Sequence, residues 1–137
     1  MALKSVQIKQ NRALKALFHK DFYTPTPQLH NELMIPMVID TCEINTVKLV
    51  HKIQNGKAPD AFDGYFTQNK DIPGRRQGTR QDEDLSTSQF KTQMLQKTFK
   101  YRGATLWNAV DKSLLNHEHA KSLGKALIKH RIANYPV

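Results

Sequence analysis

The stretch DTCEINTVKLVHKIQ, residues 40–54, carries the clearest helical pattern in the chain. Its apolar side chains recur every third residue and face one side, with Leu49 beside them: Ile44, Val47, Val50 and Ile53. Asn55 and Gly56 follow directly and predict a left-handed C-terminal stop, with Pro59 beyond it. This stretch favours a mainly α fold, which we take as the framework for the rest of the chain.

Two more helices are predicted before this stretch. Residues 3–18 show one apolar stripe at three-to-four spacing, and basic side chains fall largely off it, which is typical of an amphipathic basic helix. Pro25 and Pro27 break that pattern. Thr26 is suited to an N-cap with Pro27 at the first helical position, so a short helix is expected through Leu29 until Pro36 ends it.

The second half of the chain is predicted to be less regular. Residues 67–89 are poor in apolar side chains and predict a long polar loop. Residues 90–102 have strand character and predict two short strands or an irregular β-hairpin, carried by Phe90, Thr92, Met94, Thr98, Phe99 and Tyr101. Gly103 would then turn the chain into a helical turn at 104–110, and residues 122–132 predict a last basic helix.

The length of 137 residues allows one domain or a piece of a larger one. Within it we expect a helical segment at 1–66, a polar loop or linker at 67–89, and short strands with a basic helix at 90–137. The net charge is +9 and lies at both ends, with five Lys or Arg and no acid in residues 1–20. Such basic ends attract polyanions. The alternative is a solvated surface that only keeps the chain soluble.

Several classes of protein are disfavoured by the sequence. The single cysteine, Cys42, cannot form an internal disulfide. No signal peptide and no apolar run of about 20 residues is present, so we expect an intracellular protein, cytoplasmic and/or nuclear, without a membrane partner. His117 and His119 stand two apart, which directs their rings apart on a helix. No phosphate-binding glycine motif occurs. We predict no catalytic residue, no metal and no cofactor.

The segment FKYRGATLWN, residues 99–108, holds the only Trp and alternates aromatic with basic side chains. Aromatic rings stack on bases and cations bind phosphates, so the segment has the composition of a nucleic-acid surface. The favoured interpretation is that Phe99, Leu106 and Trp107 are packing anchors, because an isolated Trp in a chain poor in apolar residues usually packs. Arg102 is then the member free to reach a phosphate.

An ordered set of segments resembles the C-terminal region of non-LTR (LINE-type) retrotransposon reverse transcriptases, after the polymerase fingers, palm and thumb. The segments are IKQNRALK (8–15), KDFYTPT (20–26), LHNEL (29–33), VHKIQNGKAP (50–59), YFT (65–67), RRQ (75–77), FKYRGATLWN (99–108) and KSL (121–123). Val110 and Asp111 stand where the family has Leu-Pro, and Ala126 where it has an aromatic residue. The family's catalytic aspartates lie upstream, so the resemblance carries no catalytic residue to this chain.

The resemblance implies a non-catalytic part of an RNA-directed DNA polymerase that helps to hold template RNA or target DNA. Charge and position predict nine phosphate-contacting side chains: Lys9, Arg12, Lys15, Arg75, Arg76, Arg102, Lys125, Lys129 and Arg131. The partners expected are RNA or DNA of low sequence specificity and the rest of a parent polymerase. Two alternatives remain open. One is a small helical protein-interaction module that uses the apolar stripes of 3–18 and 40–54, and the other is an inert retrotransposon remnant.

Overall fold

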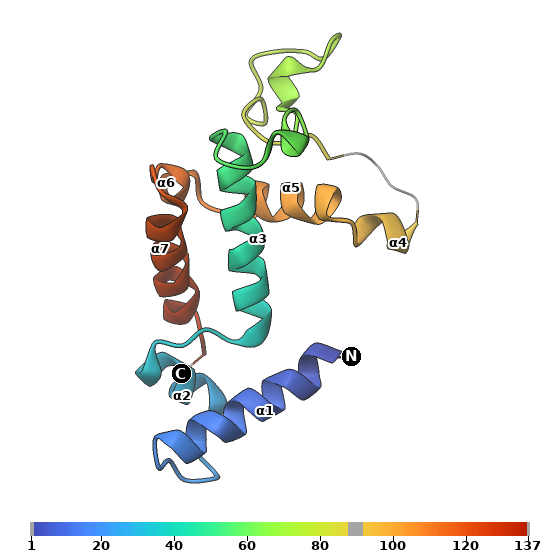
Figure 1. Ribbon diagram of the computed structural model, residues 1–137. Coiled ribbons are helices and arrows are strands. Elements are labelled where there is room, and N and C mark those ends of the chain that lie inside the picture. Colours follow the sequence, from blue (N-terminus) through green and yellow to red (C-terminus); the bar gives the residue numbers. More distant parts are fainter. Residues whose placement is uncertain (1, 88–91, 137) are drawn as a thin grey trace. The chain divides into compact units, whose positions relative to one another are not determined.

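The computed structural model describes residues 2–87 and 92–136, and these residues are mainly helical (Figure 1). They form seven α-helices, two short 3₁₀ helices and no strand. The elements are α1 (Ala2–Leu17), α2 (Thr26–Leu33), α3 (Val38–Gln54), η1 (Asp60–Phe62), η2 (Asn69–Asp71), α4 (Gln93–Gln96), α5 (Phe99–Ala109), α6 (Lys112–Leu115) and α7 (Ala120–Ala133). The predicted helical class is confirmed.

The chain divides into two compact units. The first unit comprises Met1–Asn45 and Gly124–Val137, and the second comprises Thr46–Leu123. The first unit therefore joins the two ends of the chain, and it holds eight Lys and Arg against four Asp and Glu.

The predicted β-hairpin is wrong over the part of it that the structure describes. Residues 93–96 form α4, and residues 99–109 form α5 without a turn at Gly103. Phe90 lies outside the described residues. The reason is burial: Phe99, Gly103 and Trp107 recur every fourth residue and so share one side of a helix. That shared side packs against other apolar groups, and its burial outweighs the strand preference of the aromatic residues.

The C-terminal ends of α1, α2 and α3 share one hydrogen-bond pattern. After α1, α2 and α3 a residue takes the left-handed conformation, with φ of 49° at His19, 53° at Met34 and 63° at Gly56. In each case the next backbone N–H donates to a carbonyl five residues earlier, as in a Schellman cap. The stop predicted at Gly56 is confirmed. The start of α2 lies one residue earlier than predicted, because Pro25 takes the N-cap and Thr26 is already helical.

Hydrogen bonds to the buried side chains of His30 and Asp40 connect distant parts of the first unit. The His30 ring is fully buried, with Nδ1 2.8 Å from the carbonyl oxygen of Ile35 and Nε2 3.0 Å from Asn11 Oδ1. The Tyr135 hydroxyl donates to Asp40 Oδ2 at 2.5 Å and accepts from the backbone N–H of Met37 at 3.0 Å. The Tyr135 bonds thus tie the C-terminal end of the chain to the start of α3 and to the residue just before it.

An apolar and aromatic cluster forms the core of the second unit. Buried Val50, Leu85 and Ala104 are packed by partly buried rings, those of Phe66, Phe99 and Trp107. A Cβ at Gly103 would lie 3.1 Å from Phe66 Cζ and 3.1 Å from Val50 Cγ2, so glycine permits this close approach.

The predicted polar loop folds back on itself in its described part, residues 67–87. The backbone N–H of Asn69 donates to Asp84 at 2.9 Å, and that of Ser86 donates to Thr67 at 2.7 Å. These bonds position Leu85, whose exposed fraction is 1%. The side chain of Asn108 in α5 then accepts from the backbone N–H of Leu85 at 2.8 Å and donates to the backbone carbonyl of Leu85 at 2.9 Å. The loop thus contributes a side chain to the core.

Candidate nucleic-acid interface

Two helices of the first unit carry the largest share of the predicted cations. Lys9 and Arg12 are exposed on α1, and Lys125 and Lys129 are exposed on the part of α7 that belongs to this unit. Lys125 and Lys129 are four residues apart and therefore lie on one face of α7. Neither α1 nor α7 contains an acidic residue, so no carboxylate of their own neutralises these cations.

Two other predicted cations of the first unit are held by contacts within it. Lys15 Nζ donates to the carbonyl oxygen of Phe22 at 2.5 Å and lies 5.5 Å from the centre of the Phe22 ring. Arg131 Nη2 lies 2.6 Å from Glu43 Oε2, and its Nη1 lies 3.8 Å from Asp40 Oδ1. Both side chains stabilise the fold locally, and Arg131 is thereby less available to a phosphate than Lys125 and Lys129.

The three predicted arginines of the second unit are in different settings. Arg75 Nη1 donates to Asn69 Oδ1 at 2.7 Å, which fixes it to the folded-back loop. Arg76 and Arg102 are exposed. Asp82 accepts from the Thr79 hydroxyl and from two backbone N–H groups, and these bonds, with the nearby Arg75, hold the pKa of Asp82 below its usual value. The loop therefore uses Arg75 and Asp82 to organise itself.

The aromatic side chains of residues 99–108 are not arranged as a stacking surface. Phe99 and Trp107 pack against the core of the second unit, which confirms their interpretation as packing anchors. The exposed Phe and Tyr side chains of the described residues instead lie in the first unit, at Phe18, Phe22 and Tyr23. Sequence reasoning missed them, although three aromatic residues within six positions just before Pro25 were a usable signal.

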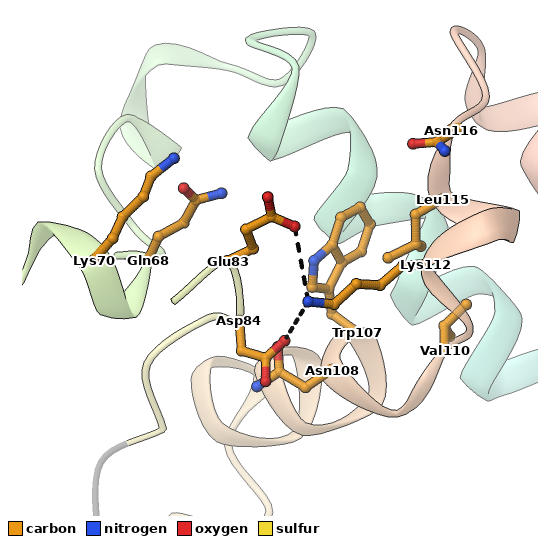
Figure 2. A pocket seen from close by; sticks show the side chains of 10 residues that line it. All are labelled: Gln68, Lys70, Glu83, Asp84, Trp107, Asn108, Val110, Lys112, Leu115 and Asn116. Carbon is orange, nitrogen blue, oxygen red and sulfur yellow. Dashed lines mark ion pairs between the residues drawn. The ribbon is translucent and has the colours of Figure 1, made fainter. Parts of the chain in front are cut away.

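A cleft of about 280 Å³ lies within the second unit (Figure 2). The Trp107 indole and Leu115 line it, together with amide side chains and the Lys112 ammonium. Lys112 Nζ lies 3.5 Å from Asp84 Oδ1 and 3.7 Å from Glu83 Oε2. Dashed lines in Figure 2 mark these two ion pairs. Because Lys112 is more than half exposed, these ion pairs contribute little to stability.

The buried His51 lies near the Trp107 ring that lines this cleft. Among the described residues, it alone has a buried side-chain nitrogen or oxygen without a hydrogen-bond partner. Its Nε2 donates to the carbonyl oxygen of His117 at 2.6 Å, while Nδ1 is buried and has no hydrogen-bond partner there. His117 thus contributes its backbone rather than its ring. In the part of the chain that the structure describes, no three His, Cys, Asp or Glu side chains gather to hold a metal ion.

No helix formed by residues 2–87 and 92–136 is long and apolar enough to cross a membrane. In comparisons with known proteins, no family model, no curated protein and no solved structure matches the chain. The residues that the structure describes thus define a class of protein, mainly helical and in two compact units.

Proposed function

We propose that this chain is a non-catalytic nucleic-acid-binding segment, of the kind that follows the polymerase core in LINE-type reverse transcriptases. The ordered sequence blocks from 8–15 to 121–123 support the family origin. The observation that carries the binding role is the acid-free pair of helices α1 and α7, with Lys9, Arg12, Lys125 and Lys129 exposed on them. Arg76 and Arg102 are further exposed cations of the second unit.

The proposed binding is electrostatic. Each Lys or Arg that neutralises a phosphate releases condensed counterions, so affinity falls steeply as salt rises, with a log–log slope of roughly 0.7 to 0.9 for each phosphate engaged. Contacts of this kind carry no base sequence information. Binding by Lys9, Arg12, Lys125 and Lys129 is therefore expected to be salt-sensitive and indifferent to sequence.

A filter-binding titration with single-stranded and duplex oligonucleotides tests the proposal. We expect binding at about 50 mM salt that weakens by at least tenfold at about 200 mM salt. The fourfold variant Lys9→Gln, Arg12→Gln, Lys125→Gln and Lys129→Gln is expected to lose most of this affinity and to have a smaller salt slope.

The matched control removes four exposed cations of the second unit, Lys52, Lys70, Arg80 and Lys97, by the same change to Gln. It lowers the net charge by the same amount. If both fourfold variants lose equal affinity, only the net charge matters and the helices are not an interface. Absence of binding at low salt would exclude the proposed function.

A second candidate function, a protein-interaction module, is favoured by a different observation. Leu3, Val6 and Leu17 of the predicted apolar stripe on α1 are exposed, at 41%, 47% and 72%. Leu14 of the same stripe is buried, whereas these three side chains are accessible to a protein partner. The same titration separates the two functions, because this module predicts no affinity for oligonucleotides at low salt.

The family origin has its own test. A genomic sequence upstream of Met1 that encodes a polymerase reading frame with an F/Y-x-D-D strand would support it. An unrelated upstream sequence would leave the electrostatic binding role to stand without the family.

A further inference from the structure

The turn that joins α1 to α2, residues 18–25, presents three aromatic side chains to solvent. The exposed fractions are 47% for Phe18, 74% for Phe22 and 86% for Tyr23. Every other Phe, Tyr or Trp of the described residues is at least partly covered. Large exposed apolar groups gathered in one place usually mark an interaction site.

The turn holds these rings in a defined geometry. His19 takes the left-handed conformation that ends α1, and the Lys20 N–H donates to the Lys15 carbonyl at 2.9 Å. Asp21 then closes a turn, accepting through its carbonyl from Thr24 at 3.1 Å and through Oδ1 from Tyr23 at 3.3 Å. The backbone hydrogen bonds of the turn therefore fix the positions at which Phe22 and Tyr23 are exposed.

The Phe22 and Tyr23 rings stand perpendicular to each other, with their centres 5.7 Å apart and an interplanar angle of 89°. Lys15 approaches Phe22 twice, through its bond to the carbonyl oxygen and through its ammonium over the ring. A cation is therefore fixed beside the exposed rings. Arg12 and Lys9 continue the positive charge along α1, one and two turns before Lys15.

The charges of the turn point to a polyanion. Lys20 is paired with Glu32 at 2.6 Å, so these two charges balance, and the remaining carboxylate of the turn, Asp21, is a single negative charge that accepts from the Tyr23 N–H. Lys9, Arg12 and Lys15 lie on the helix that leads into the turn. An exposed ring beside such cations matches one chemistry well, an unpaired base attached to a phosphate backbone. In a duplex the faces of the bases are already stacked, so this match favours single strands.

We infer that the α1–α2 turn is a base-stacking site for single-stranded RNA or DNA, with Tyr23 and Phe22 stacking on unpaired bases while Lys9 and Arg12 bind the adjoining phosphates. This inference rests on the proposed function, which it extends from electrostatic binding to a preference for single strands.

The test compares a single-stranded oligonucleotide that contains 2-aminopurine with the same sequence as a duplex, at about 50 mM salt. The full chain is expected to change 2-aminopurine fluorescence on the single strand and to bind it more tightly than the duplex. The double variant Phe22→Ala, Tyr23→Ala is expected to lose about 10- to 100-fold in single-strand affinity and to keep its duplex affinity within about twofold. Tyr23→Phe is the matched control, since it retains the ring and is expected to bind as the unchanged chain does.

Three outcomes would overturn the inference, and circular dichroism first establishes that each variant is folded. If the double variant binds the single strand as well as the unchanged chain, the rings do not stack and the proposed function still stands. If no oligonucleotide binds at all, the proposed function itself fails. If the rings instead mediate sedimentation with vesicles of anionic and neutral phospholipid, without oligonucleotide affinity, the turn is a membrane-contacting site.

Discussion

Aromatic side chains pack against the core in the second unit, but they are exposed in the α1–α2 turn of the first unit. In the second unit Phe66, Phe99 and Trp107 cover Val50 and its neighbours, whereas in the first unit Phe22 and Tyr23 face solvent. Hydrogen bonds of Tyr135, with its half-buried ring edge-to-face against His30, connect the distant segments of the first unit. Packing in a core depends on side-chain volume. A hydrogen bond depends on the direction of its donor and acceptor and on their protonation. The two units should therefore respond to different perturbations, and removing volume should have the largest effect.

Truncation of Trp107 is expected to have the largest effect on the second unit. Trp107→Ala removes a ring that packs against the core cluster and should lower the free energy of unfolding by about 3 kcal/mol. Urea denaturation followed by circular dichroism measures the loss. Trp107→Phe, which keeps most of the volume, should cost under about 1.5 kcal/mol. A loss below about 1 kcal/mol for Trp107→Ala would mean that the rings do not hold this unit together.

Loss of the Tyr135 hydroxyl tests the hydrogen bonding of the first unit. Tyr135→Phe keeps the ring but takes the hydroxyl partner away from the buried Asp40 carboxylate and from the Met37 N–H. We expect a loss of about 2 kcal/mol in the free energy of unfolding. Tyr23→Phe removes an exposed hydroxyl and should change it by less than about 0.5 kcal/mol. Equal effects of the two variants would contradict a structural role for the Tyr135 bonds.

The sequence predicted those elements whose pattern is local. The helices near residues 3–18, 40–54 and 122–132 all formed, because a three-to-four spacing needs no knowledge of the partner. α5 was missed because the aromatic residues of this segment favour strands, and the burial that overrides this preference comes from Phe66 and Val50, which lie close to Gly103 but far from it along the chain.

In the candidate interface, too, local features could be predicted from the sequence and long-range ones could not. Exposure of Lys9, Arg12, Lys125 and Lys129 followed from helix position alone. The pairing of Arg131 with Glu43 did not, since the two residues are 88 positions apart. The exposed rings at 22–23 depend on the conformation of a turn, which apolar periodicity does not describe.

Alkaline pH should weaken the first unit through Tyr135. Burial and the bond to Asp40 raise the pKa of Tyr135 to about 12, compared with 10 for a free tyrosine. The folded state then holds this proton more tightly, so the stabilisation is complete below pH 10 and is lost as the pH rises toward 12. We expect a loss of about 1–2 kcal/mol after allowance for partial exposure.

Absorbance at 295 nm checks this directly, since it follows tyrosine ionisation and Tyr135 should ionise well above pH 10. The alkaline loss of stability should be smaller in Tyr135→Phe than in the unchanged chain. A difference that stays constant from about pH 9 to about pH 12 would exclude Tyr135 as the group responsible.

The smallest predicted effects concern the helix ends, where the units differ again. The left-handed residues after α1 and α2 are His19 and Met34, whereas α3 ends on Gly56, and the described glycines with positive φ all lie in the second unit. A side chain in this conformation costs roughly 1 kcal/mol that glycine avoids. Met34→Gly should therefore raise the free energy of unfolding by up to about 1 kcal/mol, and Gly56→Ala should lower it by a similar amount. Opposite signs in urea denaturation would establish that the first unit tolerates backbone strain at its helix ends, whereas destabilisation by Met34→Gly would show that the Met34 side chain contributes more than its conformation costs.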